Sequence, residues 1–254
     1  MSAPPTSEFD GVVVAVTGAA QGIGRAIAEA FVEQGAHVAV IDVNLDAAEA
    51  TAAEIRDRGG RAVAVQCDVA RRESVQSAVE QVTEQLGAIE VLVSNAGITR
   101  PAMIRKMTLD EWDQVIDVHL NASFYWLKAV IEPMIAAGRG RIIFTSSSTA
   151  QNGSVGQVNY AAAKSGILGL MRSAAKELGR YNILVNAVAP AAVTDMTRKV
   201  LTDPKFGADP AKTILGRWAQ PDEIAPAYLF LAGKGAGFIT GQVVSVDGGS
   251  MMVR

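Results

Sequence analysis

The stretch Val12-Val-Val-Ala-Val-Thr-Gly-Ala-Ala-Gln-Gly-Ile-Gly24 runs from an apolar segment of strand length into a turn with three glycines. Apolar residues then recur at helical spacing over residues 22–34. In such a strand–turn–helix, Gly18 permits a tight turn, Gly22 lets the backbone approach a pyrophosphate, and Gly24 lets helix and strand pack closely. The first N–H groups of the helix face the phosphate charge. The stretch therefore predicts a dinucleotide site, and its context argues against the alternative of a glycine-rich turn without a ligand.

The alternation of strands and helices continues to the end of the chain. Strands are expected at residues 12–16, 37–42, 62–68, 89–94, 141–145, 183–189 and 243–246, and helices at 22–34, 44–58, 74–86, from Thr108 toward Pro133, at 157–180 and from 221 to about 231. Strands that are apolar on both faces and separated by helices predict an α/β fold with a doubly wound parallel sheet covered on both sides.

The domain organisation follows from the absence of a linker or a break in composition. We expect a flexible polar tail at residues 1–10 and a single domain at residues 11–254 that carries both the cofactor and the substrate sites. Residues 194–212 are the least periodic part, and we expect a loop or short-helix insertion there of the kind that forms lids.

Composition excludes several classes of protein. The 254 residues are 49% hydrophobic with a net charge of 23 − 26 = −3, which is not the basic excess of a nucleic-acid-binding protein. The longest uncharged stretch, residues 142–163, contains Ser, Asn and Gln side chains that a membrane interior would not tolerate. A single cysteine, Cys67, and no evident secretion signal predict a cytoplasmic protein. Cys67, His37 and His119 lack the spacing of metal ligands, so no metal is expected.

Asp42 indicates which dinucleotide binds. It ends the second predicted strand, 18 residues after Gly24, where a carboxylate can accept hydrogen bonds from the adenosine ribose hydroxyls. The 2′-phosphate of NADP would meet this carboxylate as a like charge, so Asp42 favours NAD over NADP. The alternative is that Asp42 is merely a solvated residue at the end of a strand. Asp68 and Val69, after the third strand, could hold the adenine, although a turn role for Asp68 fits the spacing almost as well.

Three side chains suggest chemistry on an alcohol. Tyr160 and Lys164 are four residues apart on a predicted helix and share a face. A charge on Lys164 at ~6 Å would contribute roughly 2–3 kcal/mol at an effective dielectric of ~20, so we expect it to lower the pKa of Tyr160 by about 2 units from ~10. Ser147, 13 residues before Tyr160 and just past the fifth strand, can orient a substrate oxygen, although its neighbours Ser146 and Ser148 have the same chemistry.

The glycine spacing, Ser94-Asn-Ala-Gly97, Asn121, Ser147 and Tyr160-Ala-Ala-Ala-Lys164 together resemble the short-chain dehydrogenase/reductase family, from about Val12 to Gly249. The resemblance implies a Rossmann-like, seven-stranded parallel sheet of order 3-2-1-4-5-6-7, a nicotinamide cofactor, and a homotetramer or homodimer. It also implies that Ser147, Tyr160 and Lys164 are catalytic and that Asn121 holds a water beside the lysine. For Asn121, a local helix-bending role is the alternative.

The positions expected to bind the cofactor follow from the motifs and the resemblance. They are Gly18, Gln21, Gly22, Ile23, Gly24, Asp42, Asp68, Val69, Asn95, Ala96, Gly97, Tyr160, Lys164, Pro190, Val193 and Thr194.

Two positions depart from the family pattern. Ser94 replaces the first Asn of Asn-Asn-Ala-Gly, while Asn95 matches the second and is expected to support the central strand and the cofactor. Ala191 follows Pro190 where the family has glycine, and the loop to Thr194 is one residue shorter. In relatives this loop touches the nicotinamide amide, and we expect Thr194 and the Val193 backbone to keep that contact.

The implied activity is hydride transfer between NAD(H) and a secondary alcohol or ketone, with Tyr160 as general acid and base. The segment 141–190 also resembles 3-oxoacyl-thioester reductases, which usually prefer NADP, and Asp42 argues against that alternative. A catalytically silent dinucleotide sensor is a third hypothesis, which the complete catalytic set disfavours. The expected partner is a small alcohol or ketone, with neither nucleic acid nor a membrane involved.

Overall fold

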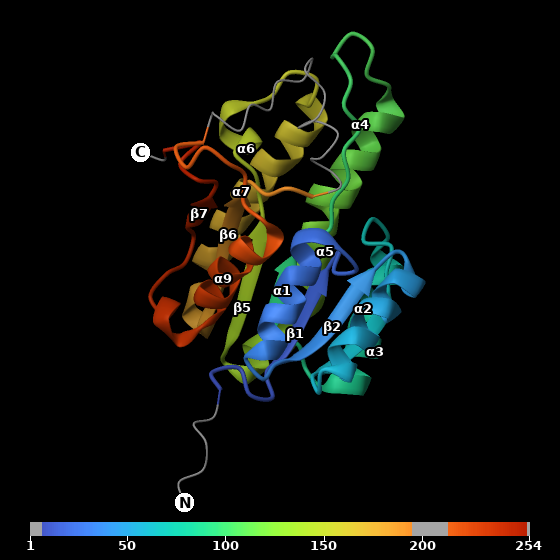
Figure 1. Cartoon of the computed structure of the whole chain (residues 1–254), viewed down its shortest axis with the longest axis vertical. Helices are drawn as coiled ribbons and strands as arrows, with labels where there is room; N and C mark the ends of the chain where they lie inside the picture. Colours follow the sequence, from blue (N-terminus) through green and yellow to red (C-terminus); the bar gives the residue numbers. More distant parts are fainter. Residues whose placement is uncertain (1–6, 195–212, 253–254) are drawn as a thin grey trace, which may run out of the picture.

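The computed structural model describes residues 7–194 and 213–252. Within these ranges, parallel strands form one seven-stranded sheet in the order β3-β2-β1-β4-β5-β6-β7, with helices on both faces (Figure 1). The strands are β1 (Val13–Thr17), β2 (His37–Asp42), β3 (Arg61–Gln66), β4 (Val91–Ser94), β5 (Gly140–Thr145), β6 (Ile183–Pro190) and β7 (Val243–Val246). The predicted fold class and strand order are confirmed.

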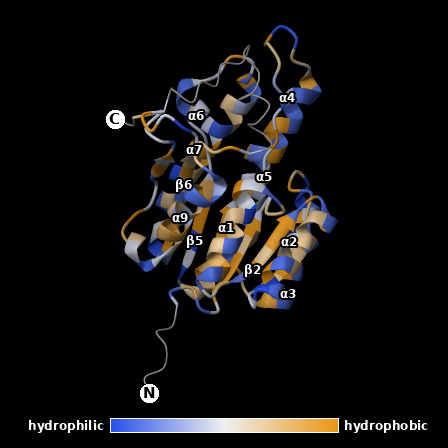
Figure 2. Ribbon diagram, viewed as in Figure 1, coloured by the Kyte–Doolittle hydropathy of each residue, from blue (hydrophilic) through white to orange (hydrophobic). Residues whose placement is uncertain are grey.

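Two layers of helices bury the sheet. On one side lie α1 (Gly22–Glu33), α2 (Leu45–Asp57) and α9 (Pro221–Ala232), and on the other lie α3 (Arg72–Leu86), α5 (Ala122–Ala137) and α7 (Val158–Leu178). The short helices are α6 (Thr149–Asn152), η2 (Gly179–Tyr181) and η4 (Lys234–Ala236). Strand β1 contributes Val14 and Val16 to the first layer and Val13 and Ala15 to the second. Figure 2 shows the resulting apolar strands between the helices.

The central strands bring distant segments to one edge of the sheet. Val16 of β1 lies in register with Val40 of β2 and Val93 of β4. The chain leaves β1 toward β2 on one side, whereas β4 leads toward β5 on the other, so the carboxyl ends of β1 and β4 form the switch point where such folds bind ligands.

The helix predicted from Thr108 toward Pro133 contains an irregular turn. The capping box is confirmed, because Thr108 Oγ1 accepts a hydrogen bond from Glu111 N (3.1 Å) and Glu111 Oε2 accepts one from Thr108 N (2.8 Å). Helix α4 (Leu109–Ile116) then passes into a π-helical turn, η1 (Asp117–Asn121), before α5. Helix α5 also continues past Pro133 to Ala137, beyond the predicted end. Short π-helical turns often occur at functional sites.

The prediction of a flexible tail at residues 1–10 is wrong for residues 7–10. The Phe9 ring is buried with its centroid 5.1 Å from that of Phe31, in an edge-to-face arrangement. Glu8 Oε1 also accepts a hydrogen bond from Lys234 N. Most of the expected lid, residues 195–212, lies outside the described residues. No helix in the described ranges is long and apolar enough to cross a membrane.

Candidate active site

The glycine loop after β1 has the shape of a phosphate cradle. Gly18 and Gly22 adopt φ values of +64° and +57°, which disfavour other residues. A Cβ on Gly24 would lie 2.1 Å from Gly18 O, so only glycine fits there. Helix α1 starts without a side-chain cap from Gln21 and without an acidic residue in its first turn. Its first N–H groups, including that of Ile23, can therefore bind an anion, and the residues present fit a dinucleotide pyrophosphate.

Hydrogen bonds join this loop to the end of β4. Thr17 Oγ1 accepts hydrogen bonds from Asn95 N (2.9 Å) and Ala96 N (3.0 Å). Asn95 Nδ2 donates to Thr17 O (3.0 Å) and to Gly18 O (3.3 Å). A Cβ on Gly18 would lie 2.8 Å from Ala96 Cα, so the two segments touch. The side chain of Asn95 is thus placed to hold the loop against the sheet.

The second and third strands end in two aspartates with different surroundings. Asp42 Oδ2 accepts a hydrogen bond from Ala20 N of the glycine loop (3.2 Å), and Oδ1 accepts one from Asn44 N (3.1 Å). Its carboxylate is therefore fixed beside the loop. Asp68 Oδ1 instead accepts a hydrogen bond from Ala70 N (3.1 Å) in a local turn, which is the alternative role that its spacing left open, and Val69 is buried.

The shortened loop after β6 is tied to the sheet and to the segment before α9. Beyond Pro190, Ala191 N donates to Val246 O (3.0 Å), and Val193 N donates to Ala219 O (2.9 Å). The N–H group of Val193 is thus engaged within the protein. A Cβ on Gly22 would lie 3.6 Å from Thr194 Cγ2, so Thr194 lies beside the glycine loop, where its hydroxyl could contact the cofactor.

The structure brings Ser147, Tyr160 and Lys164 together at the carboxyl edge. The Ser147 side chain lies close enough to the Tyr160 phenol to lower its pKa. Lys164 Nζ lies 5.6 Å from the centroid of the Tyr160 ring and donates to Thr145 O (2.6 Å). Thr145 Oγ1 also donates to Asn95 Oδ1 (3.4 Å), which connects helix α7, through Lys164, to the glycine loop.

Burial governs the charges of this group. It raises the pKa of Tyr160 to about 12, although the nearby Ser147 side chain acts to lower that pKa. Burial also lowers the pKa of Lys164 to about 7. The pKa of Tyr160 is therefore raised and not lowered as expected, because the interior disfavours both the phenolate and the ammonium.

The fourth residue of the predicted catalytic set is on the irregular turn before α5. Asn121 lies in the π-helical turn, and its Nδ2 donates to Asp117 Oδ1 (2.6 Å), which favours the local helix-bending role. The ring that lies against Tyr160 is that of His119, with centroids 5.2 Å apart and planes at 85°. Sequence reasoning considered His119 only as a metal ligand. His119 lies only two residues before Asn121, and this closeness is the signal that the sequence offers. A regular helix cannot show which of the two side chains faces Tyr160, because both lie in a π-helical turn.

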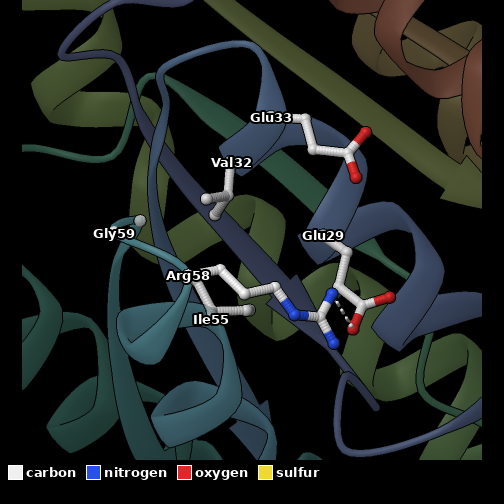
Figure 3. Close-up of a pocket in the computed structure, with 7 residues that line it drawn as sticks. Glu29, Val32, Glu33, Ile55, Arg58 and Gly59 are labelled. Atoms are coloured by element: carbon white, nitrogen blue, oxygen red, sulfur yellow. Dashed lines mark ion pairs between the residues drawn. The ribbon is translucent and has the colours of Figure 1, made fainter.

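A separate hollow of about 270 Å³ lies between the carboxyl-terminal ends of α1 and α2 (Figure 3). Glu29 and Arg58 form an ion pair across it (3.6 Å), and Val32 and Ile55 form its apolar wall. These helix ends lie at the amino edge of the sheet, so this hollow does not belong to the site at the carboxyl edge.

A comparison with protein families gives the class of protein. The family model described as Enoyl-(Acyl carrier protein) reductase matches residues 18–251. Together with the sheet order and the assembled site, this match shows that the chain belongs to the short-chain dehydrogenase/reductase family. It is an oxidoreductase that binds a nicotinamide dinucleotide and acts on the hydroxyl or keto group of a small molecule.

Individual relatives are similar over nearly their whole length. The 3-oxoacyl-[acyl-carrier-protein] reductase of Chlamydia trachomatis is 44% identical, over 92% of this chain and 95% of the relative. That of Synechocystis sp. is 42% identical, over 94% and 97%. A crystal structure of a protein from Agrobacterium tumefaciens, provisionally described as a gluconate dehydrogenase, superposes with a TM-score of 0.93 at 31% identity, covering 97% of this chain and 98% of that one.

The lowered pKa of Lys164 predicts a specific pH dependence of stability. Between pH 7 and 10.5 the unfolded chain holds the Lys164 proton and the folded chain releases it, so the free energy of unfolding rises with pH across this window. Lys164→Met removes the titrating group. The increase in the free energy of unfolding between pH 7 and 9.5, measured by urea unfolding, should therefore be smaller by on the order of 2 kcal/mol. Lys176→Met, at an exposed position of the same helix, should keep it. An undiminished rise in the Lys164 variant would contradict the burial argument.

Proposed function

We propose that this protein transfers a hydride between NAD(H) and a secondary alcohol or ketone, with Tyr160 as general acid and base. One observation carries the proposal: Ser147 and Lys164 both lie beside the Tyr160 side chain, at the edge of the sheet that holds the glycine loop. The proposal assigns the cofactor to the glycine loop, Asp42 and the ends of β3, β4 and β6. It places both sites in one domain over residues 11–254.

The residues divide the chemistry of ketone reduction between them. The Ser147 hydroxyl orients the substrate oxygen, and Tyr160 Oη gives that oxygen a proton as the carbon is reduced. With a pKa of about 12, Tyr160 holds its proton at neutral pH and can act as the acid. Lys164, as its ammonium, stabilises the phenolate that this transfer leaves. When bound, the cofactor supplies or accepts the hydride and, in its oxidised form, a positive charge that favours the reverse reaction.

The cofactor form is argued from Asp42. Ala20 N and Asn44 N hold its carboxylate beside the glycine loop, so a 2′-phosphate at the adenosine ribose would meet a fixed like charge. The ribose hydroxyls of NAD could instead donate to it. This geometry supports NAD as the cofactor.

Assembly and location belong to the same proposal. Phe124 on α5 and Phe238 are exposed apolar side chains, which supports burial in a homotetramer or homodimer. The single, buried Cys67 suits a cytoplasmic protein.

A second candidate is reduction of a 3-oxoacyl thioester. Its support is the activity named for the Chlamydia and Synechocystis relatives, whereas the Agrobacterium structure is described as acting on a polyhydroxy acid. The same Ser147, Tyr160 and Lys164 would serve either substrate, since both reactions interconvert a ketone and a secondary alcohol.

Replacing Tyr160 tests the reaction class. Tyr160→Phe keeps the ring but removes the proton, so turnover should fall by at least ~100-fold while NADH binding is retained. The measurement is NADH- and NADPH-linked turnover on secondary alcohols, diols, cyclic ketones, sugars and acyl thioesters, together with a fluorescence titration of NADH. Tyr181→Phe, away from the site, is the matched control. Undiminished turnover in the Tyr160 variant would exclude Tyr160 as the acid and base.

Replacing Asp42 tests the cofactor form. Asp42→Asn keeps an acceptor for the loop but removes the charge, so the ratio of the NADPH to the NADH dissociation constant should fall by about tenfold or more. Asp46→Asn, in the exposed first turn of α2, should leave the ratio unchanged. If Asp42→Asn also left it unchanged, the preference for NAD would have another origin.

A further inference from the structure

We propose that His119, rather than Asn121, is the fourth functional side chain of the site, and that it positions the ring of Tyr160. This inference rests on the proposed role of Tyr160 as acid and base. The family resemblance assigns the fourth place to an asparagine, whereas this inference assigns it to a histidine.

The first observation is the contact itself. The His119 and Tyr160 rings meet edge to face, with centroids 5.2 Å apart, and His119 is only 2% exposed. The π-helical turn that carries His119 packs on α7, which carries Tyr160 and Lys164. A rigid ring on this side limits rotation of the Tyr160 ring, and the alignment of the phenol with the substrate oxygen depends on that orientation.

The second observation is that His119 is itself held in place. Its Nε2 lies 2.8 Å from Ile98 O and 3.1 Å from Ile98 N. A Cβ on Gly97 would lie 2.3 Å from His119 Cε1, so glycine at that position leaves room for the imidazole.

Ser94, one of the departures from the family pattern, supports the same turn. Ser94 Oγ hydrogen-bonds Ser123 Oγ (3.3 Å), and Ser123 Oγ donates to His119 O (2.6 Å). The serine at the end of β4 is thereby linked to the backbone of the residue that contacts Tyr160.

The third observation is an unsatisfied polar atom. His119 Nδ1 is buried without a hydrogen-bond partner among the described residues. If Nε2 carries the proton and donates to Ile98 O, Nδ1 is an unpaired acceptor; if Nε2 accepts from Ile98 N, Nδ1 is an unpaired donor. A buried polar atom without a partner is costly in either tautomer, and such atoms are commonly kept for function.

The charge state of His119 suits this position. Burial, with the charge of Lys164 as a smaller cause, lowers the pKa of His119 to about 3, so the ring is neutral at working pH. The titratable groups that face it are Tyr160 and Lys164, both from α7. A neutral neighbour leaves Lys164 as the cation beside the phenol, whereas a protonated imidazole would repel it.

The test compares variants at both positions by kcat, by KM for NADH and ketone, and by the pH dependence of kcat. His119→Leu should lower kcat on the order of tenfold to a hundredfold, change the KM for NADH less than about threefold, and shift the pH profile. His119→Asn, which can still bond Ile98, should recover part of kcat. Asn121→Ala should cost less than His119→Leu, and His37→Leu at the amino edge of the sheet should behave as wild type.

The outcomes separate this inference from the proposed function. If Tyr160→Phe is inactive while His119→Leu keeps the wild-type kcat and pH profile, the role of His119 is overturned and that of Tyr160 stands. A greater loss in Asn121→Ala than in His119→Leu also overturns it. If His119→Leu fails to bind NADH or to fold by circular dichroism, His119→Asn decides, and an unchanged kcat and pH profile in that variant overturns the inference.

Discussion

The hydrogen bonds between the carboxyl ends of β1 and β4 are the interaction on which the site depends. Thr17 and Asn95 exchange hydrogen bonds through side chain and backbone, and Asn95 also holds Gly18 O. Thr145 extends the link, because it bonds Asn95 through its hydroxyl and Lys164 through its carbonyl. The phosphate cradle and the catalytic helix are thereby fixed to a single sheet edge, although they are far apart in the sequence.

The same packing that aligns these groups makes them costly to charge. Burial shifts the pKa values of Tyr160, Lys164 and His119 toward their neutral forms, so at neutral pH Tyr160 and His119 are uncharged and Lys164 is only partly protonated. In the proposed reaction, negative charge develops on the substrate oxygen and on the phenol. Fixed polar groups stabilise such charge more strongly in a buried site than in water. Burying Lys164 costs stability at neutral pH, which fits the functional role proposed for it.

The sequence was informative wherever a local pattern determines the structure. Strands buried on both faces appear as continuous apolar runs, and the glycines of the loop are required by backbone geometry at Gly18 and Gly24. Features that depend on tertiary packing were missed. The π-helical turn rotates His119 toward Tyr160, and helical spacing assumes a regular helix. The pKa of Tyr160 lies in the direction opposite to the prediction because burial, which the sequence does not give, raises it. Phe9 was assigned to a tail because its partner, Phe31, lies in a different element.

The most direct measurement of the central claim is a crystal structure of the protein with NADH. We expect the pyrophosphate at the N-terminus of α1, the adenosine ribose hydroxyls on Asp42, and the nicotinamide ring between Thr194 and the Tyr160–Lys164 pair. The orientation of the His119 ring against Tyr160 should be unchanged. A dinucleotide bound away from the carboxyl ends of β1 and β4, or with its nicotinamide remote from Tyr160, would contradict the central claim.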